Sequence, residues 1–263
     1  MDLATIKRIG IRAAYRAGRI LIDHFDKPLD VRKKGAIDLV TQADLASEKQ
    51  IVATINEVFP GHGILAEESG AARGNGHDLW IIDPLDGTTN FAHRLPIFAV
   101  SIAYFRDDAP LVGIVFNPAN GELFTAVHGE GAHLNGAPIG VSVTERVGDS
   151  LLVTGFPYTI RDTPPDKPVA RFTRCLKAAQ GVRRLGSAAL DLCYVACGRF
   201  EGFWEENLKP WDTAAGMLIV QEAGGKVTDY KDRRFHIDDM QILATNARIH
   251  REMVQLLDLE DCV

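Results

Sequence analysis

Residues 78–96, with the sequence DLWIIDPLDGTTNFAHRLP, join an apolar run to two closely spaced acids. The run 79–82 has the composition of a buried strand, and it leads directly into Asp83 and Asp86. Pro84 lies between the two acids, fixes its own φ and holds the residue before it extended. A stiff bend therefore aims both carboxylates in fixed directions.

Two further apolar segments also end in acids. The segment 64–70, ILAEESG, leads to Glu67 and Glu68, and the segment 209–225, KPWDTAAGMLIVQEAGG, places Asp212 at the start of a predicted helix. Taken alone, Asp212 is explained as a helix cap, and the two glutamates as a solvated loop. The acids beside the proline are harder to explain in this way, because the bend fixes the direction of both side chains.

If the acids of the three segments converge, their mutual repulsion requires protonation or bound cations. Carboxylates alone select hard ions such as Mg²⁺ or Mn²⁺, whereas zinc prefers the His and Cys ligands that these motifs lack. Mg²⁺ held in this way shares its shell with water and substrate phosphate, and the free amides of Gly87 and Thr88 are suitable donors to phosphate oxygens. Two ions about 4 Å apart would lower the pKa of a bound water and neutralise the leaving oxygen. The motifs therefore predict hydrolysis of a phosphate monoester.

Hydrophobic periodicity predicts the order of the elements. We expect amphipathic helices at about 6–21 and 42–58, meander strands at 97–105, 111–118 and 122–129, a hairpin turn at 135–136, and then alternating strands (151–156, 181–186, 201–206, 241–246) and helices (171–180, 187–197, after 211, and at the end). This order predicts an α+β N-terminal lobe over residues 1–145, with an antiparallel sheet and most of the metal ligands. An α/β C-terminal lobe over residues 146–263 would carry the substrate-recognition residues and Asp212.

The composition argues against several other classes of protein. The 263 residues are 46 % hydrophobic and 24 % charged, and the formal net charge of −6 with neutral His disfavours nucleic acid or an anionic membrane as the main partner. No segment has the roughly 20 apolar residues of a membrane helix, and the first residues do not resemble a signal peptide. The four cysteines fit neither a zinc spacing nor a disulfide framework, and Cys193 and Cys197 are expected in the core. We therefore expect a cytoplasmic protein that binds neither nucleic acid nor membrane.

Three motifs together resemble the inositol monophosphatase family of Mg²⁺-dependent, lithium-sensitive sugar phosphatases. They are WIIDPLDGTTNF at 80–91, ILAEES at 64–69 and WDTAAGMLIVQEAGG at 211–225. The resemblance implies the layered α-β-α-β-α sandwich of the inositol monophosphatase and fructose-1,6-bisphosphatase type, with α+β and α/β parts. It also implies a homodimer and two or three Mg²⁺ ions, for which Mn²⁺ is a substitute.

The resemblance assigns a role to each acid of the three motifs. The implied ligands are Glu67, Asp83 and the carbonyl of Leu85 for the first metal, and Asp83, Asp86 and Asp212 for the second. Glu67 and Thr88 would orient the nucleophilic water, and Asp44 would hold the Thr88 hydroxyl. Glu68 would reach a third, weaker metal through water.

Substrate recognition is assigned mainly to the C-terminal part of the chain. The segment 183–192, RRLGSAALDL, resembles the family segment that touches the sugar ring. The implied substrate-binding residues are Gly186, Ser187, Ala188, Glu205 and Asp212, with Glu205 favoured over its neighbour Glu206 as the acid that binds a ring hydroxyl. Further candidates are Lys33, favoured over Lys34, with Asp38, and Arg183 or Arg184. His93 is expected to be structural, and Arg94 departs from the small residue that is frequent at its position in the family.

The leading hypothesis is hydrolysis of myo-inositol 1-phosphate, or of a similar small polyol or sugar phosphate, by in-line attack of a metal-bound water. Related phosphatases that act on 3′-phosphoadenosine 5′-phosphate, fructose 1,6-bisphosphate, NADP or histidinol phosphate are the nearest alternatives. The alternative from another class is a regulatory binding module of the same fold. The complete set of expected metal ligands favours the enzyme. A dinucleotide-dependent oxidoreductase is disfavoured, because no Gly-x-Gly-x-x-Gly follows a strand.

Overall fold

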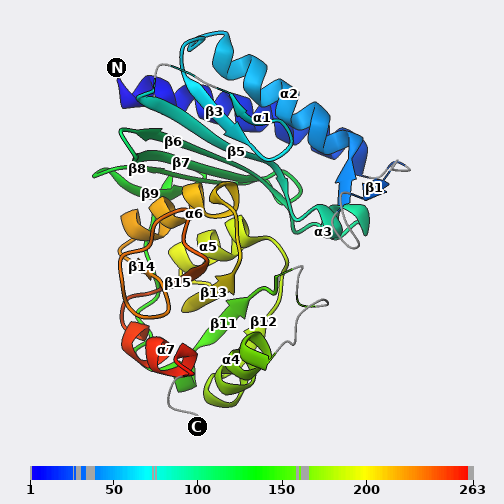
Figure 1. The fold of residues 1–263 in the computed structure, drawn as a ribbon. Coiled ribbons are helices and arrows are strands. Elements are labelled where there is room, and N and C mark those ends of the chain that lie inside the picture. Colours follow the sequence, from blue (N-terminus) through cyan, green and yellow to red (C-terminus); the bar gives the residue numbers. More distant parts are fainter. Residues whose placement is uncertain are drawn as a thin grey trace.

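The computed structural model describes residues 2–25, 27, 31–33, 39–72, 74, 76–157, 160 and 166–259. Figure 1 shows five layers, in which helices and sheets alternate from the N-terminal helices to the C-terminal helix. Helices in the central layer separate an eight-stranded sheet from a five-stranded one, and further helices cover the outer face of each sheet. The fold is therefore the layered α-β-α-β-α sandwich that the family resemblance implies.

The outer layer consists of α1 (Leu3–Phe25) and α2 (Gln42–Asn56). On α1 the buried positions recur every three or four residues, as in Ile6, Ile9 and Ala13, so that one face of the helix packs against the sheet. Both helices are confirmed, although α2 ends slightly earlier than the pattern predicts. None of the helices in the described ranges combines the length and the apolar character that crossing a membrane requires.

The first sheet has eight strands in the order β10-β9-β8-β7-β6-β5-β3-β4. Its strands are β3 (Gly63–Ala66), β4 (Gly70–Ala72), β5 (Asp78–Asp86), β6 (Ala99–Arg106), β7 (Ala109–Asn117), β8 (Glu122–Val127), β9 (Gly131–Leu134) and β10 (Ala137–Ile139). All neighbours are antiparallel except β3 and β5, which are parallel. The predicted meander is confirmed as β6 to β8. The predicted hairpin turn is also confirmed, because Asn135 and Gly136 have φ values of 50° and 80°. A separate antiparallel pair, β1 (Val31–Lys33) and β2 (Leu39–Thr41), precedes α2.

The second sheet has five strands in the order β12-β11-β13-β15-β14. Its strands are β11 (Leu151–Thr154), β12 (Gly181–Arg183), β13 (Gly202–Glu206), β14 (Lys226–Thr228) and β15 (Gln241–Thr245), and the remaining helices are α3 (Thr88–Ala92), η1 (Val147–Asp149), α4 (Asp166–Ala178), α5 (Ala188–Ala196), α6 (Pro210–Glu222) and α7 (His250–Leu257). β11 is parallel to β12 and β13, whereas β15 is antiparallel to β13 and β14. The predicted alternation of strands and helices is confirmed, and β14 is an additional strand.

Strand β5 is buried on both faces because helices cover both sides of the first sheet. Ile81 packs into the central layer around α5 and α6, whereas its neighbours Trp80 and Ile82 pack under α1 and α2. This alternation is the two-residue period of a strand, and apolar side chains on both faces produce the continuous apolar run in the sequence. The acids that follow Ile82 are therefore attached to one of the most rigid parts of the molecule.

The turn after α3 explains part of the departure at Arg94. The helix ends where the amides of Arg94 and Leu95 donate to the carbonyls of Phe91 and Asn90, at 3.0 and 2.9 Å. Arg94 then adopts a φ of 60°, in the left-handed region, and its side chain is exposed. Such a conformation is unfavourable for a residue with a Cβ atom, and a glycine adopts it without this cost.

We expect Arg94→Gly to stabilise the protein by about 1 kcal/mol, because it removes the left-handed strain without removing a buried contact. Thermal unfolding would detect this as a rise in the midpoint of about 2–4 °C. Arg146→Gly is the matched control, because Arg146 is also exposed but has a φ of −132°, which any residue adopts. Equal destabilisation by both substitutions would contradict the role given to the φ of Arg94.

Candidate active site

The acids of β5 lie at an irregularity of the strand. Asp83 is opposite Ser101 of β6 and Asp86 is opposite Ala99, so the register shifts between the two acids. Pro84 has no amide hydrogen for the ladder, and such a shift re-aims the side chains beside it. The strand therefore continues through both acids, where the apolar run alone suggested that it ends before them.

Each β5 carboxylate is held by hydrogen bonds that leave part of it available. Asp83 Oδ1 accepts a hydrogen bond from the amide of Leu85 at 2.9 Å. Asp86 Oδ2 accepts one from Ser187 Oγ at 2.6 Å and another from the amide of Ala189, in the first turn of α5, at 2.8 Å. These bonds leave the second oxygen of each group, Asp83 Oδ2 and Asp86 Oδ1, to face a metal ion.

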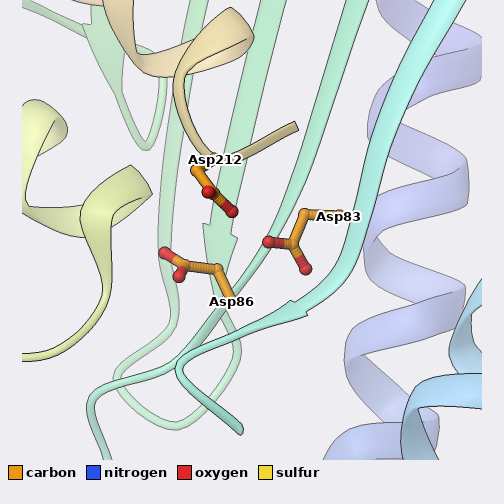
Figure 2. A group of neighbouring side chains, drawn as sticks. All are labelled: Asp83, Asp86 and Asp212. Atoms are coloured by element: carbon orange, nitrogen blue, oxygen red, sulfur yellow. The ribbon is translucent and has the colours of Figure 1, made fainter. Parts of the chain in front are cut away.

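Asp212 completes a cluster of three carboxylates from two elements. Figure 2 shows Asp83 and Asp86 on β5 pointing toward Asp212 at the start of α6. One oxygen from each of the three carboxylates lies within 4.8 Å of the others. Asp212 Oδ2 also accepts a hydrogen bond from the amide of Lys209 at 2.7 Å. The structural and the functional interpretations of Asp212 are thus compatible, since its carboxylate both caps the helix and faces the cluster.

The electrostatics of this cluster favour a bound cation. Burial raises the pKa of Asp83 well above its usual range, and the charges of Glu67, Asp86 and Asp212 raise it further. Burial also raises the pKa of Asp86 to about 6, against the opposing effect of the Ser187 hydrogen bond. The pKa of Asp212 rises to about 8, through burial and then through the charge of Asp86. A divalent cation would replace these protons and remove the repulsion.

The cluster lies in a cavity of about 310 Å³ between the two sheets. Its lining includes most of the predicted site residues, namely Glu67, Asp83, Leu85, Asp86, Gly87, Thr88, Gly186, Ser187, Ala188, Glu205 and Asp212. The parallel pairing of β3 and β5 brings Glu67 to the cluster, and the Glu67 amide donates to the carbonyl of Ile82 at 3.2 Å. The volume is sufficient for a small phosphorylated molecule and not for a large polymer.

Thr88 is connected to a buried acid behind the cavity. Its Oγ1 lies 3.2 Å from Oδ1 of Asp44 and 3.1 Å from the carbonyl oxygen of Leu85, with geometry suited to donating to either. Asp44 itself is fully buried on α2. A threonine hydroxyl has one hydrogen, so donation to either acceptor leaves its lone pairs to accept a hydrogen bond from a water in the cavity.

Several of the weaker candidates lie outside the cavity. Arg183 is exposed and donates to the carbonyl of Val182, whereas Arg184 lines the cavity. The amide of Glu68 donates to Glu48 Oε2 at 2.8 Å, and Glu68 is not a lining residue. His93 and Arg94 are exposed and are likewise absent from the lining. Asp38 and Lys34 lie outside the described residues, and Lys33 is the last residue of β1.

The lining also includes residues to which the sequence analysis assigned no role in the site. They are Phe156, Pro157, Asn207, Leu208, Lys209 and Trp211. Asn90 is a further connection, because its Nδ2 lies 2.8 Å from the carbonyl of Leu185 and 3.3 Å from that of Gly186, and so joins the segment after β5 to the segment before α5. Lys209 is the residue before α6 and lies three positions before Asp212. This short spacing from a predicted metal ligand was the only sign in the sequence that Lys209 lies near the site.

Comparison with known proteins agrees with the motifs. The sequence matches the profile described as the inositol monophosphatase family over residues 2–259. The chain belongs to the inositol monophosphatase family. It is 46 % identical to an inositol-1-monophosphatase from Synechocystis over 97 % of this chain and 90 % of that protein. It is 43 % identical to the Nus factor SuhB of Haemophilus influenzae, over 94 % of this chain and 93 % of that protein.

Solved structures of the family have the same fold. The crystal structure of the extragenic suppressor protein suhB from Bartonella henselae superposes with a TM-score of 0.93 at 40 % identity. The match covers 97 % of this chain and 99 % of that one, so every layer of the sandwich has a counterpart. Relatives in the inositol monophosphatase family thus carry two kinds of name, one for a phosphatase and one for a Nus factor.

Proposed function

We propose that the protein is a Mg²⁺-dependent phosphomonoester hydrolase that acts on myo-inositol 1-phosphate or a similar small polyol or sugar phosphate. The observation that carries this proposal is the convergence of Asp83, Asp86 and Asp212 in the same cavity as Glu205. Membership of the inositol monophosphatase family supports phosphatase chemistry. An all-carboxylate cluster supports Mg²⁺ as the natural ion and Mn²⁺ as a substitute.

The residues present fit two metal positions. Glu67, Asp83 and the carbonyl of Leu85 would hold one ion, and Asp83, Asp86 and Asp212 the other. Bound Mg²⁺ supplies charge neutralisation and a lower pKa for a coordinated water. Glu67 and Thr88 would orient that water for in-line attack on phosphorus, while Asp44 holds the Thr88 hydroxyl. The amides of Gly87 and Thr88 would donate to the phosphate oxygens.

Glu205 is suited to bind the hydroxyls of the substrate ring. It is buried at the end of β13, and no residue in the described ranges donates a hydrogen bond to its carboxylate. Glu206, by contrast, forms an ion pair with Arg171 at 2.5 Å. A carboxylate without a protein donor accepts hydrogen bonds from a polyol, whereas Glu206 is already satisfied.

A panel of phosphate monoesters assayed with Mg²⁺ tests the proposed substrate class. The panel contains myo-inositol 1-phosphate, fructose 1,6-bisphosphate, 3′-phosphoadenosine 5′-phosphate, NADP and histidinol phosphate, and the rate of phosphate release is measured for each. We expect the highest kcat/KM for the inositol ester, with side activities on other small esters. A large preference for the nucleotide bisphosphate would overturn this choice.

We expect Glu205→Gln to lower kcat/KM for myo-inositol 1-phosphate by about 10- to 100-fold, because the glutamine amide offers one acceptor oxygen to the ring hydroxyls where the carboxyl group offers two. Hydrolysis of p-nitrophenyl phosphate, which has no ring hydroxyls, should change by less than about twofold, since its phosphate end meets the same groups. Glu130→Gln is the matched control, because Glu130 is exposed and outside the cavity. An equal loss on both substrates would argue against the role of Glu205.

A second candidate function is a binding module of the same fold, which is favoured by the relatives named Nus factor. The Asp86→Asn variant separates the two functions, because it removes a metal ligand and leaves the outer surface unchanged. The variant would be expressed in a strain that lacks its own copy of the gene. Restored growth would favour the binding function, and failure to restore growth would favour hydrolysis.

A further inference from the structure

Gly155 leaves the space that the Glu205 carboxylate occupies. Gly155 directly follows β11, which runs parallel to β13 and places Thr154 opposite Trp204. A Cβ atom added to Gly155 would lie 2.1 Å from Oε1 of Glu205 and 2.2 Å from both Cδ and Oε2. These distances are far inside van der Waals contact, so the present position of the carboxylate requires glycine at 155.

The glycine is required for space and not for backbone conformation. Gly155 is absent from the glycines with positive φ, so other residues can adopt its backbone geometry. The three atoms nearest to the added Cβ all belong to the mobile end of the Glu205 side chain. A larger residue would therefore displace this carboxylate and leave the backbone in place.

The two strands cannot separate easily to admit a side chain. Thr154 Oγ1 donates to the carbonyl oxygen of Trp204 at 2.6 Å, and both residues are buried. The backbone pairing of β11 with β13 also fixes the separation of the two strands. Because the strands are joined immediately before Gly155 and Glu205, the clash would be relieved by the Glu205 side chain. Glu205 lines the cavity, so its displaced carboxylate would move into the cavity.

The position of the Glu205 carboxylate is set by shape, since no hydrogen-bond donor in the described part of the chain holds it. Charged groups on four segments of the chain surround it. Asp212 and Asp86 on α6 and β5 repel it, and Arg184 of the segment before α5 attracts it. Asp191 on α5 also interacts with Glu205, and Asp191 Oδ1 is buried without a partner among the described residues. The gap at Gly155 is therefore the feature that selects one position for Glu205.

We propose that Gly155 is a specificity-determining residue, which holds the Glu205 carboxylate where the ring hydroxyls of a polyol phosphate reach it. This inference rests on the proposed function and adds a residue to it. A side chain at 155 would move the carboxylate into the polyol end of the cavity. Esters that carry a hydroxylated ring would then bind poorly, while the metal cluster and the phosphate position would be unchanged.

The test compares Gly155→Ala, Glu205→Ala and the double variant on myo-inositol 1-phosphate and p-nitrophenyl phosphate. For Gly155→Ala we expect kcat/KM on the inositol ester to fall about tenfold or more, mainly through KM, and turnover of the aryl ester to change less than about twofold. In the Glu205→Ala background, Gly155→Ala should have no further effect on selectivity, because the displaced group is absent. Gly61→Ala is the control, since nothing lies within 4 Å of the added Cβ there.

Each outcome decides between the inference and its alternatives. Unchanged selectivity in Gly155→Ala, with lowered selectivity in Glu205→Ala, would overturn the inference and leave the proposed function standing. Unchanged selectivity in Glu205→Ala would overturn the proposed function itself. If Gly155→Ala loses activity on both esters, its unfolding midpoint is compared with that of the double variant. Recovery of stability and of aryl ester turnover in the double variant would support the clash with Glu205, and persistent loss would overturn it.

Discussion

Replacing Asp86 with asparagine is expected to remove most Mg²⁺-dependent turnover while the fold is retained. The proposal makes Asp86 a direct metal ligand, so the loss should exceed the roughly 100-fold that loss of an outer-shell partner costs. The amide oxygen of asparagine can still accept from Ser187 Oγ or from the amide of Ala189, which preserves the packing at α5. Steady-state phosphate release at saturating Mg²⁺, with circular dichroism as a check of the fold, measures both effects.

The control for this variant is Asp238→Asn, which makes the same chemical change at an exposed acid outside the cavity. It should retain the activity of the unmodified protein. Unaffected turnover in Asp86→Asn would refute the metal assignment. A negatively charged ligand cannot be replaced by a neutral one without lowering the affinity of the site for Mg²⁺. Loss of activity together with loss of the fold would instead assign Asp86 a structural role.

Mg²⁺ is expected to stabilise the protein much more at about pH 8 than at about pH 5. In the metal-free protein, burial raises the pKa of Asp83, of Asp86 to about 6 and of Asp212 to about 8, and neighbouring carboxylates contribute to the rise at Asp83 and Asp212. The folded state then binds more protons than the unfolded state, so the free energy of unfolding falls as the pH rises from about 4 toward about 8. Mg²⁺ binds the ionised carboxylates and restores this stability where the protons are lost.

The size of the effect follows from binding linkage. At a Mg²⁺ concentration about 100 times the dissociation constant, the stabilisation is about 2.7 kcal/mol, or roughly 5–10 °C in the unfolding midpoint. Thermal unfolding with Mg²⁺ or with a chelator, at several pH values, measures it. Asp86→Asn should reduce both the Mg²⁺ effect and the decrease with pH. A Mg²⁺ effect that is independent of pH would contradict a site made of carboxylates with raised pKa values.

Local sequence patterns were sufficient to predict most of the fold. The helix periodicity of α1, the meander of β6 to β8 and the Asn135–Gly136 turn depend on neighbouring residues, and each is confirmed. Strand β14 has three residues, too few for a period of two to be recognised. The register shift at Pro84 was also missed, because it depends on the pairing of β5 with β6. The division of the chain at residues 145 and 146 stays a prediction.

The candidate site was predictable where one residue type and its spacing determine the chemistry. The three aspartates of the cluster came from motifs, and the structure brings them together. Which of two adjacent residues faces the cavity was harder to predict, because that depends on strand direction and on distant side chains. Arg184 lines the cavity instead of Arg183, and the pairing of Glu206 with Arg171 is a contact across 35 positions of the sequence. The space at Gly155 has no signal in the sequence, since it is defined by a side chain on another strand.

The most direct test of the metal centre is a crystal of the protein grown with Mn²⁺, examined by anomalous scattering. We predict a strong anomalous peak between Asp83, Asp86 and Asp212, with carboxylate oxygens about 2.1 Å away, and a second peak near Glu67 and the Leu85 carbonyl. Substrate added to the same crystals would show its ring hydroxyls at Glu205. The absence of a peak at this cluster, at a Mn²⁺ concentration that supports turnover, would contradict the proposed mechanism.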